Sequence, residues 1–308
     1  LTCEGINPKG VTTGLSGMRS FWRTAPFRAD AARPAAKRSY GEALRRAIDY
    51  VFRAPELSAF AAGQPVPPKQ QALNGYPSKT FSAAIQAMVR AAESMPERRE
   101  KALQIARLSA EWLLKNSQPA DAPLAFWPET YASDTNQACW CPELRGRIML
   151  LYPASVGRAY LKLAAATGER RWIDAAERIA ETYVKVRRKD GTWALVMEIA
   201  TGRELCPNTL VPDGLMAFFE ELHRATGAAR WRTLADECFA WVEAGPLKDW
   251  NWEGQFEDTK PRPPYGNLCH GNAMTIMRHI LRRYPGDPAK LALARELIRY
   301  AEDQFVHW

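Results

Sequence analysis

Residues 160–172 read YLKLAAATGERRW, and residues 219–231 read FEELHRATGAARW, 59 positions later and without a gap. The same offset places Gly227, the counterpart of Gly168, on Gly286 in a Tyr-Pro-Gly-Asp stretch. Self-similarity at a fixed period is the sequence signature of a repeat architecture. A glycine between two helical patterns predicts a left-handed helix C-cap, a conformation that a residue without a side chain adopts at little cost. Each copy is therefore predicted to be a helix, a tight turn and a second helix.

Apolar residues keep the same register on both sides of the glycine. The coinciding sets are Val156, Leu215 and Met274; Ala159, Phe218 and Met277; Leu163, Leu222 and Leu281; and Ala176, Ala235 and Ala294. Their spacing of three, four and seven is that of the buried stripe of a helix. Looser copies lie upstream, with helices predicted over 76–88 and 96–113 and a further helix after the capping box Ser39 to Glu42.

These patterns predict an all-α (α/α)6-type toroid of repeated helical hairpins, complete or lacking part of its ring. The first helix of each pair is the more apolar, so we expect first helices inside and second helices outside. We predict a single domain over residues 1–308, with an irregular segment over 1–38 and regular hairpins from about residue 76. The connections between pairs are long, and all precede inner helices. They cover roughly 117–145, 188–207 and 245–266, and we expect them to gather on one rim, with a small β-hairpin over 192–200.

Composition leaves the compartment open. The net charge of +8 suits an anionic partner but is spread over helix surfaces, and no nucleic-acid-binding motif accompanies it. No stretch is long and apolar enough for a membrane span. No leader is visible, which leaves the bacterial cytoplasm and the periplasm as alternatives. No cofactor motif is present, and none is expected.

The repeat register brings chemically distinct side chains to the rim. Ser78, Ala154, Asp213 and Asn272 share one position, and Tyr76, Tyr152, Val211 and His270 share another. Asp213 and His270 replace small or apolar residues of other copies. They are catalytic candidates, although Asp213 could simply cap its helix and His270 could be structural.

Two connections on this rim are rich in aromatic, acidic and amide groups. Sugar rings stack on exposed aromatic faces, while carboxylates and amides bind hydroxyl groups. The candidate substrate-binding residues are Trp127, Glu129, Tyr131, Trp250, Trp252, Gln255, Asp258, Tyr265, Asn267 and Asn272. The alternative for Trp250 and Trp252 is that they pack inward.

A glycoside hydrolase commonly needs two carboxyl groups, one on each side of the scissile bond. The candidates on the rim are Glu129, Glu198, Asp213, Glu257 and Asp258. We favour Asp213 and Glu257, with His270 as a third catalytic residue. Arg145, Arg158 or Arg262 could bind a substrate carboxylate.

A zinc site is a competing interpretation of the same rim. Cys139, Cys141, Cys206, Cys269 and His270 are predicted in its connections and helix starts, and zinc binds such ligands. The thiols are scattered and Cys-x-Cys is tighter than common zinc motifs, so no metal is the favoured prediction.

The hairpins with their ATGxxRW turns resemble the six-hairpin glycosidases and related polysaccharide lyases. The stretches PLAFWPETY, GQFED, PPYGNLCHGNA and AEDQFVHW resemble the β-glucuronidase group called glycoside hydrolase family 154, over roughly residues 70–308. This resemblance implies a hydrolase of glucuronic-acid-containing glycans that needs no cofactor.

Three functions remain open at this point. The first is a hydrolase acting on acidic oligosaccharides or polysaccharides, so that the expected partner is an anionic carbohydrate. The second is a polysaccharide lyase or sugar epimerase, in which Tyr265 and His270 would serve as acid and base. The third is a non-catalytic toroid that binds carbohydrate or protein.

Overall fold

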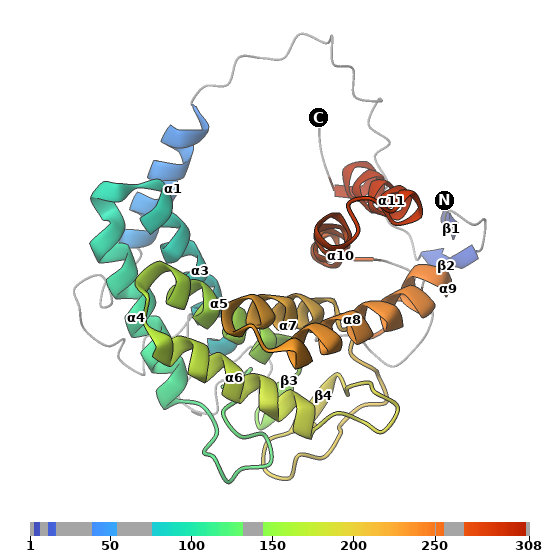
Figure 1. The fold of residues 1–308 in the computed structure, drawn as a ribbon, viewed down its shortest axis with the longest axis horizontal. Coiled ribbons are helices and arrows are strands. Elements are labelled where there is room, and N and C mark those ends of the chain that lie inside the picture. The colour runs from blue at the N-terminus through green and yellow to red at the C-terminus, as the bar shows by residue number, and fades with distance from the viewer. Residues whose placement is uncertain are drawn as a thin grey trace.

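A computed structural model describes residues 3–6, 12–16, 39–53, 76–131, 144–249, 251–255 and 268–305. Its helices form an arc of antiparallel pairs around a common centre (Figure 1). After the single helix α1 (Tyr40–Arg53), the pairs follow one another in sequence order. They are α3 (Pro77–Ser94) with α4 (Arg99–Lys115), α5 (Leu151–Thr167) with α6 (Arg170–Lys185), α7 (Asp213–Thr226) with α8 (Ala229–Ala244), and α10 (His270–Arg283) with α11 (Pro288–Phe305). The predicted helical hairpins are confirmed.

Short elements complete the described chain. A 3₁₀ turn (Pro96–Arg98) joins α3 to α4, and the short helix α9 (Pro246–Asp249) follows α8. Strands β1 (Cys3–Ile6) and β2 (Thr12–Ser16) pair antiparallel, so the prediction of an irregular segment over residues 1–38 is wrong for these two stretches. Strands β3 (Arg147–Met149) and β4 (Val196–Glu198) form a second antiparallel pair.

Two copies of the repeat turn have the same geometry. Gly168 and Gly227 have φ of 75° and 73°, and their amides donate to the carbonyls of Ala164 and His223 at 2.7 and 2.8 Å. An arginine then covers a buried tryptophan in both copies. The guanidinium carbon of Arg171 lies 4.1 Å from the Trp172 ring centroid, and the equivalent distance from Arg230 to Trp231 is 4.0 Å. Positive φ is why both copies carry glycine at this position.

The third copy departs from this geometry. Helix α10 ends before Gly286, with the Tyr284 amide bonded to the Ile280 carbonyl at 2.9 Å, and Gly286 does not have a left-handed φ. Leu281, predicted to be buried, is 45% exposed. The buried face of α10 instead contains Ala273, Ile276 and Ile280. A slip of about one residue in α10 explains this, because Ala294 in α11 is again buried where the register predicts.

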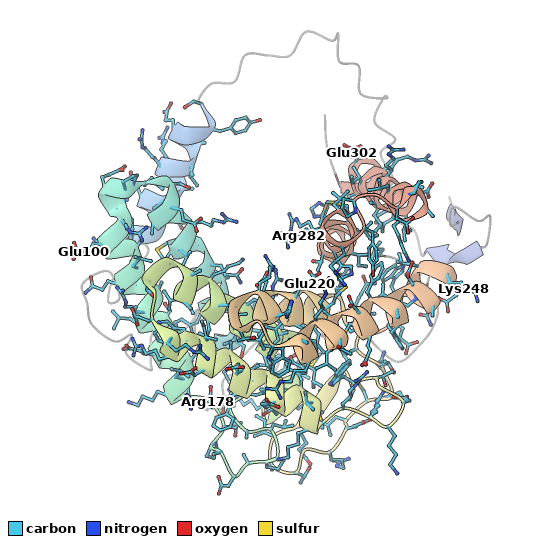
Figure 2. The ribbon with its side chains drawn as sticks, viewed as in Figure 1. Glu100, Arg178, Glu220, Lys248, Arg282 and Glu302 are labelled. Carbon is cyan, nitrogen blue, oxygen red and sulfur yellow. The ribbon has the colours of Figure 1, made fainter. Side chains whose placement is uncertain are left out.

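The first helices of the pairs form the inner layer. Helix α5 packs between α3 and α7, and α10 follows against α7. The approach of α5 to α7 is close, since a Cβ at Gly157 would overlap the Phe218 ring. Figure 2 shows Glu220 and Arg282 on the side of α7 and α10 that faces the centre, whereas Glu100 and Arg178 point outward from α4 and α6. The predicted inner and outer layers are confirmed.

The long connections meet at the N-terminal ends of the inner helices, as predicted. The amide of Ser78 at the start of α3 donates to the Glu129 carbonyl at 3.3 Å. The Met149 amide, just before α5, donates to the Thr130 hydroxyl at 3.0 Å. The Val211 amide, just before α7, donates to the Gly254 carbonyl at 3.2 Å. These bonds join the described parts of the loops at the starts of α3, α5 and α7.

A β-hairpin lies on this rim, although its position differs from the prediction. Its arms are 193–198 and 203–210, joined by bonds such as Glu198 amide to Arg203 carbonyl at 2.8 Å and Leu210 amide to Trp193 carbonyl at 2.9 Å. Thr201-Gly202 forms the turn rather than the end of the hairpin. None of the helices among the described residues is long and apolar enough to cross a membrane.

Candidate functional site

Asp213 and Asn272 meet at the rim. Each lies in the first turn of an inner helix, α7 and α10 respectively, and Nδ2 of Asn272 donates to Oδ1 of Asp213 at 2.8 Å. Asp213 is only 7% exposed. The repeat register predicts both residues at inner-helix starts on one rim, and the structure brings these two equivalent positions into contact.

Burial changes the acidity of Asp213. Desolvation is the dominant effect and raises the pKa of Asp213 from 3.8 to about 6, against smaller lowering effects of the Asn272 bond, the Gly214 amide and the charge of Arg158. A carboxyl group with such a pKa is protonated in a useful fraction of molecules near neutrality. Asp213 can therefore donate a proton, which an ordinary surface aspartate does poorly.

A tight loop ties α7 and α10 together beside this pair. Gly254 has φ of 90°, and a Cβ there would overlap the Thr209 carbonyl, so this close approach requires glycine. The Glu253 carboxylate accepts from the Asn208 amide group at 2.9 Å. Gln255 is 7% exposed, and its Oε1 accepts from the Cys269 amide at 2.7 Å. Gln255 thus helps to fix the start of α10, where the exposed His270 is the first residue.

Tyrosines gather at the neighbouring part of the rim. The ring centroid of Tyr76, just before α3, lies 4.8 Å from that of Tyr131 and 6.2 Å from that of Tyr152 at the start of α5. Tyr131 and Tyr152 are buried, whereas Tyr76 is partly exposed, and Glu129 is also partly exposed. Tyr76 and Tyr152 were noted from the sequence as sharing a register position but were not predicted as site residues. Their shared position at the start of inner helices was the signal.

Three predicted sugar platforms are not exposed. Trp127 is fully buried, and its indole N–H donates to the Ile179 carbonyl at 3.1 Å. Trp252 is also fully buried, and Tyr131 is 1% exposed. The prediction that these rings are displayed on the loops is wrong, because the connections fold back into the core and bury them. For Trp252 the inward-packing alternative is the correct one.

Glu198 lies on the rim, as predicted, but its carboxylate is held within the β-hairpin. Its carboxylate accepts from the Thr201 hydroxyl at 2.6 Å and lies 3.6 Å from Arg203, within the turn of the β-hairpin. The hydrogen bond from Thr201 lowers the pKa of Glu198. Glu198 therefore stabilises the hairpin and is not suited to proton donation.

Several predicted residues lie outside the described chain. They are Trp250, Glu257, Asp258, Tyr265 and Asn267, together with Arg262, Cys139 and Cys141. Their roles stay predictions.

Metal ligands do not cluster in the part of the rim that the structure describes. No three His, Cys, Asp or Glu side chains come together there in a way that could hold an ion. Cys206 and Cys269 are free thiols within the described stretches. The zinc interpretation now depends on Cys139 and Cys141.

A second polar layer lies deeper on the inner wall. Arg158 of α5 donates to Glu221 of α7 at 2.9 Å, and the Lys162 ammonium contacts Oε1 of Gln86 in α3. Gln86, Lys162 and Glu221 each stand eight residues after Ser78, Ala154 and Asp213, so they form an equivalent layer. The register could have identified this layer, but only Arg158 was considered as a substrate ligand.

No family model matches this sequence, and no curated protein sequence matches it either. Solved structures do match it in fold. Cellobiose 2-epimerase from Spirochaeta thermophila has a TM-score of 0.58 at 16% identity, covering 84% of this chain and 70% of the epimerase. An unsaturated glucuronyl hydrolase from a Bacillus species, responsible for glycosaminoglycan degradation, has a TM-score of 0.55 at 15% identity, covering 87% and 74% of the two chains. A sugar epimerase from a ruminal bacterium has a TM-score of 0.54 at 12% identity, covering 85% and 71%.

The chain is an (α/α)6-type toroid. The predicted fold class is confirmed, and the three structures named above are a hydrolase and two epimerases. At these identities the similarity establishes the fold alone.

Proposed function

We propose that this toroid is a glycoside hydrolase acting on acidic oligosaccharides, with Asp213 as the proton donor. The observation that carries the proposal is the buried carboxyl group of Asp213, whose pKa is raised to about 6 at the rim where the connecting loops meet. Hydrolysis of a glycosidic bond requires an acid that is still protonated near neutral pH, to protonate the leaving oxygen.

The remaining roles follow from the same mechanism. A second carboxylate must act as base or nucleophile, and we propose Glu257 for it, with Asp258 and Glu129 as the alternatives on the rim. Asn272 is a positioning residue, because its hydrogen bond orients the Asp213 carboxyl group. His270, exposed at the start of α10, is proposed to contact the substrate near the reacting bond.

Charge supports an acidic substrate. Arg158 and Lys162 lie on the side of α5 that no neighbouring helix covers. Arg90 lies on the equivalent side of α3, and Arg224 lies on that of α7. Arg158 and Arg90 are ion-paired with Glu221 and Glu93, so the excess positive charge comes from Lys162 and Arg224, which form no ion pair among the described residues. A wall with excess positive charge attracts anionic ligands. Within this class we propose glucuronic-acid-containing glycans, following the sequence resemblance to family 154 and the activity of the fold neighbour that is a glucuronyl hydrolase.

An epimerase is the second candidate, favoured by the presence of His270 on the rim and by two fold neighbours that are epimerases. Here His270 would remove and return a proton on a sugar carbon. A lyase would likewise use His270 and Tyr265.

Mass analysis of the products distinguishes these functions. The toroid is incubated with uronic-acid oligosaccharides, and the products are weighed and scanned in the ultraviolet. Hydrolysis yields fragments whose summed mass exceeds that of the substrate by one water. Fragments without added water that absorb in the ultraviolet would establish a lyase, and an isomer of unchanged mass would establish an epimerase. Either result would overturn the hydrolase.

A further inference from the structure

The inner wall carries a cation layer two helical turns from the rim. Lys162 stands eight residues after Ala154, the repeat equivalent of Asp213. Eight residues of α-helix extend about 12 Å. Lys162 therefore does not contact the sugar whose glycosidic oxygen lies at Asp213. It can contact a sugar unit further along the same oligosaccharide.

Lys162 faces the centre of the toroid. Helix α5 is covered by α3, α4, α6 and α7, and its uncovered residues recur at helical spacing: Leu151, Ser155, Arg158, Lys162 and Ala165. Since neighbouring helices occupy the other sides of α5, this stripe faces inward. Lys162 is thus displayed on the wall of the ring.

The carboxylates nearest to Lys162 are bound to arginines. Glu221 accepts from Arg158 at 2.9 Å, and Glu93 accepts from Arg90 at 3.0 Å. Among the residues that the structure describes, the direct contact of the Lys162 ammonium is the neutral amide of Gln86, and no carboxylate lies within ion-pair distance of it. The charge of Lys162 is therefore not neutralised locally.

The same layer has unused hydrogen-bonding capacity. Nε of Arg158 and Oε2 of Glu221 are buried and form no hydrogen bond within the described chain. Oε1 of Gln86 faces Lys162, which leaves the amide nitrogen of Gln86 as a further donor. Buried polar groups without partners are uncommon. The Arg158 Nε donor is suited to an anionic ligand, whereas the Glu221 Oε2 acceptor is not.

We propose that Lys162 and Gln86 form a subsite for a second uronate carboxylate of the substrate. The subsite rests on the proposed function, since it assumes that the substrate is an acidic glycan bound with its scissile bond at Asp213. A lysine binds a carboxylate as a point charge, and the amide nitrogen of Gln86 donates to the same group. The substrate class is then a chain with at least two acidic sugars, rather than a glycan with a single terminal uronate.

Binding rather than turnover tests this subsite. The protein carries Asp213→Asn to prevent reaction, and calorimetry measures its affinity for a trimer of glucuronic acid. The matched ligand is the same trimer with its carboxyl groups reduced to alcohols. We expect the acidic trimer to bind at least tenfold more tightly than the reduced trimer.

Variants assign that preference to Lys162. Lys162→Met is expected to lose most of this preference, because methionine keeps most of the side-chain length and removes the charge, whereas Lys162→Arg is expected to keep most of it. Lys185→Met makes the same charge change on the exposed end of the outer helix α6 and is the control. Equal affinity for the two trimers, or a preference that survives Lys162→Met, overturns the subsite.

The two proposals fail separately. Product formation by the protein with its native Asp213 reports on the hydrolase, and the binding preference reports on the subsite. A hydrolase with no preference for the acidic trimer would retain the proposed function and reject the subsite.

Discussion

Asn272 Nδ2 donates to Oδ1 of Asp213 at 2.8 Å, and the two residues occupy the same position in successive repeats, 59 residues apart. The starts of α7 and α10 are thus in contact, and Asn272 at the start of α10 holds the carboxyl group of Asp213 at the start of α7. In the preceding copy the equivalent residue is Ala154, which cannot do this. The proposed proton donor thus lies at a departure from the repeat.

Replacing Asp213 with asparagine should stabilise the folded protein at neutral pH. A pKa raised from 3.8 to about 6 means that the ionised carboxylate is disfavoured in the folded state. The contribution of Asp213 to the free energy of unfolding is therefore most favourable below pH 4. It decreases by up to about 3 kcal/mol as the pH rises through 6. Asparagine keeps an oxygen for Asn272 and removes this cost.

Denaturant unfolding at pH 4 and pH 7.5 measures the effect. The gain from Asp213→Asn should be small at the lower pH and largest at the higher pH. A variant that is less stable than the native protein at pH 7.5 would mean that the Asp213 carboxylate is well solvated or paired.

The pH dependence of activity should follow the protonation of Asp213. Because the donor must be protonated, kcat/KM should fall as pH rises above about 6. Asn272→Leu removes a hydrogen bond that favours the ionised form, so it should move this fall to higher pH. Thr275→Val changes another polar residue of α10, one bonded to the Gly271 carbonyl, and should leave the fall in place. An unchanged pH profile in Asn272→Leu would mean that the fall in kcat/KM does not report the protonation of Asp213.

Gly254→Ala should destabilise the protein more than Gly168→Ala. Both positions have positive φ, which costs a non-glycine residue about 1 kcal/mol. Only at Gly254 would the added Cβ also overlap the Thr209 carbonyl, whereas it would meet open space at Gly168. Thermal unfolding should show the larger fall in Tm for Gly254→Ala. Equal falls would mean that the loop around Gly254 moves to accommodate the Cβ without losing stability.

Trp127→Phe should lower stability without changing glycan affinity. The buried indole loses its bond to the Ile179 carbonyl, at a cost of about 1–3 kcal/mol including the smaller ring volume. Urea unfolding and calorimetry with the same oligouronide check the two parts. A weaker affinity at unchanged stability would restore Trp127 as a sugar platform.

The hairpins could be predicted from the sequence because each depends on local signals. The glycine turns, the helical spacing of apolar residues and the capping patterns all act within a few residues. The slip in α10 could not be predicted, because Ile276 and Ile280 compete with Met277 and Leu281 for the buried face, and tertiary packing decides between them.

The rim was predicted in position but not in detail. The register brought Asp213 to Asn272, since equivalent positions of adjacent helices meet. The loops carry no period, and whether Trp127 and Trp252 face solvent or core depends on contacts with distant segments. Burial of Asp213, which raises its pKa and keeps it protonated to higher pH, likewise arises from the assembled rim and not from its neighbours in sequence.

The most direct test of proton donation by Asp213 compares two substrates with Asp213→Asn. One is a uronic-acid oligosaccharide, whose leaving oxygen must be protonated, and the other is the corresponding glycosyl fluoride, whose leaving group needs little help. If Asp213 is the proton donor, kcat/KM falls by about 10²–10⁴-fold on the oligosaccharide and much less on the fluoride. Equal losses on both substrates would contradict the assignment of Asp213 as the proton donor.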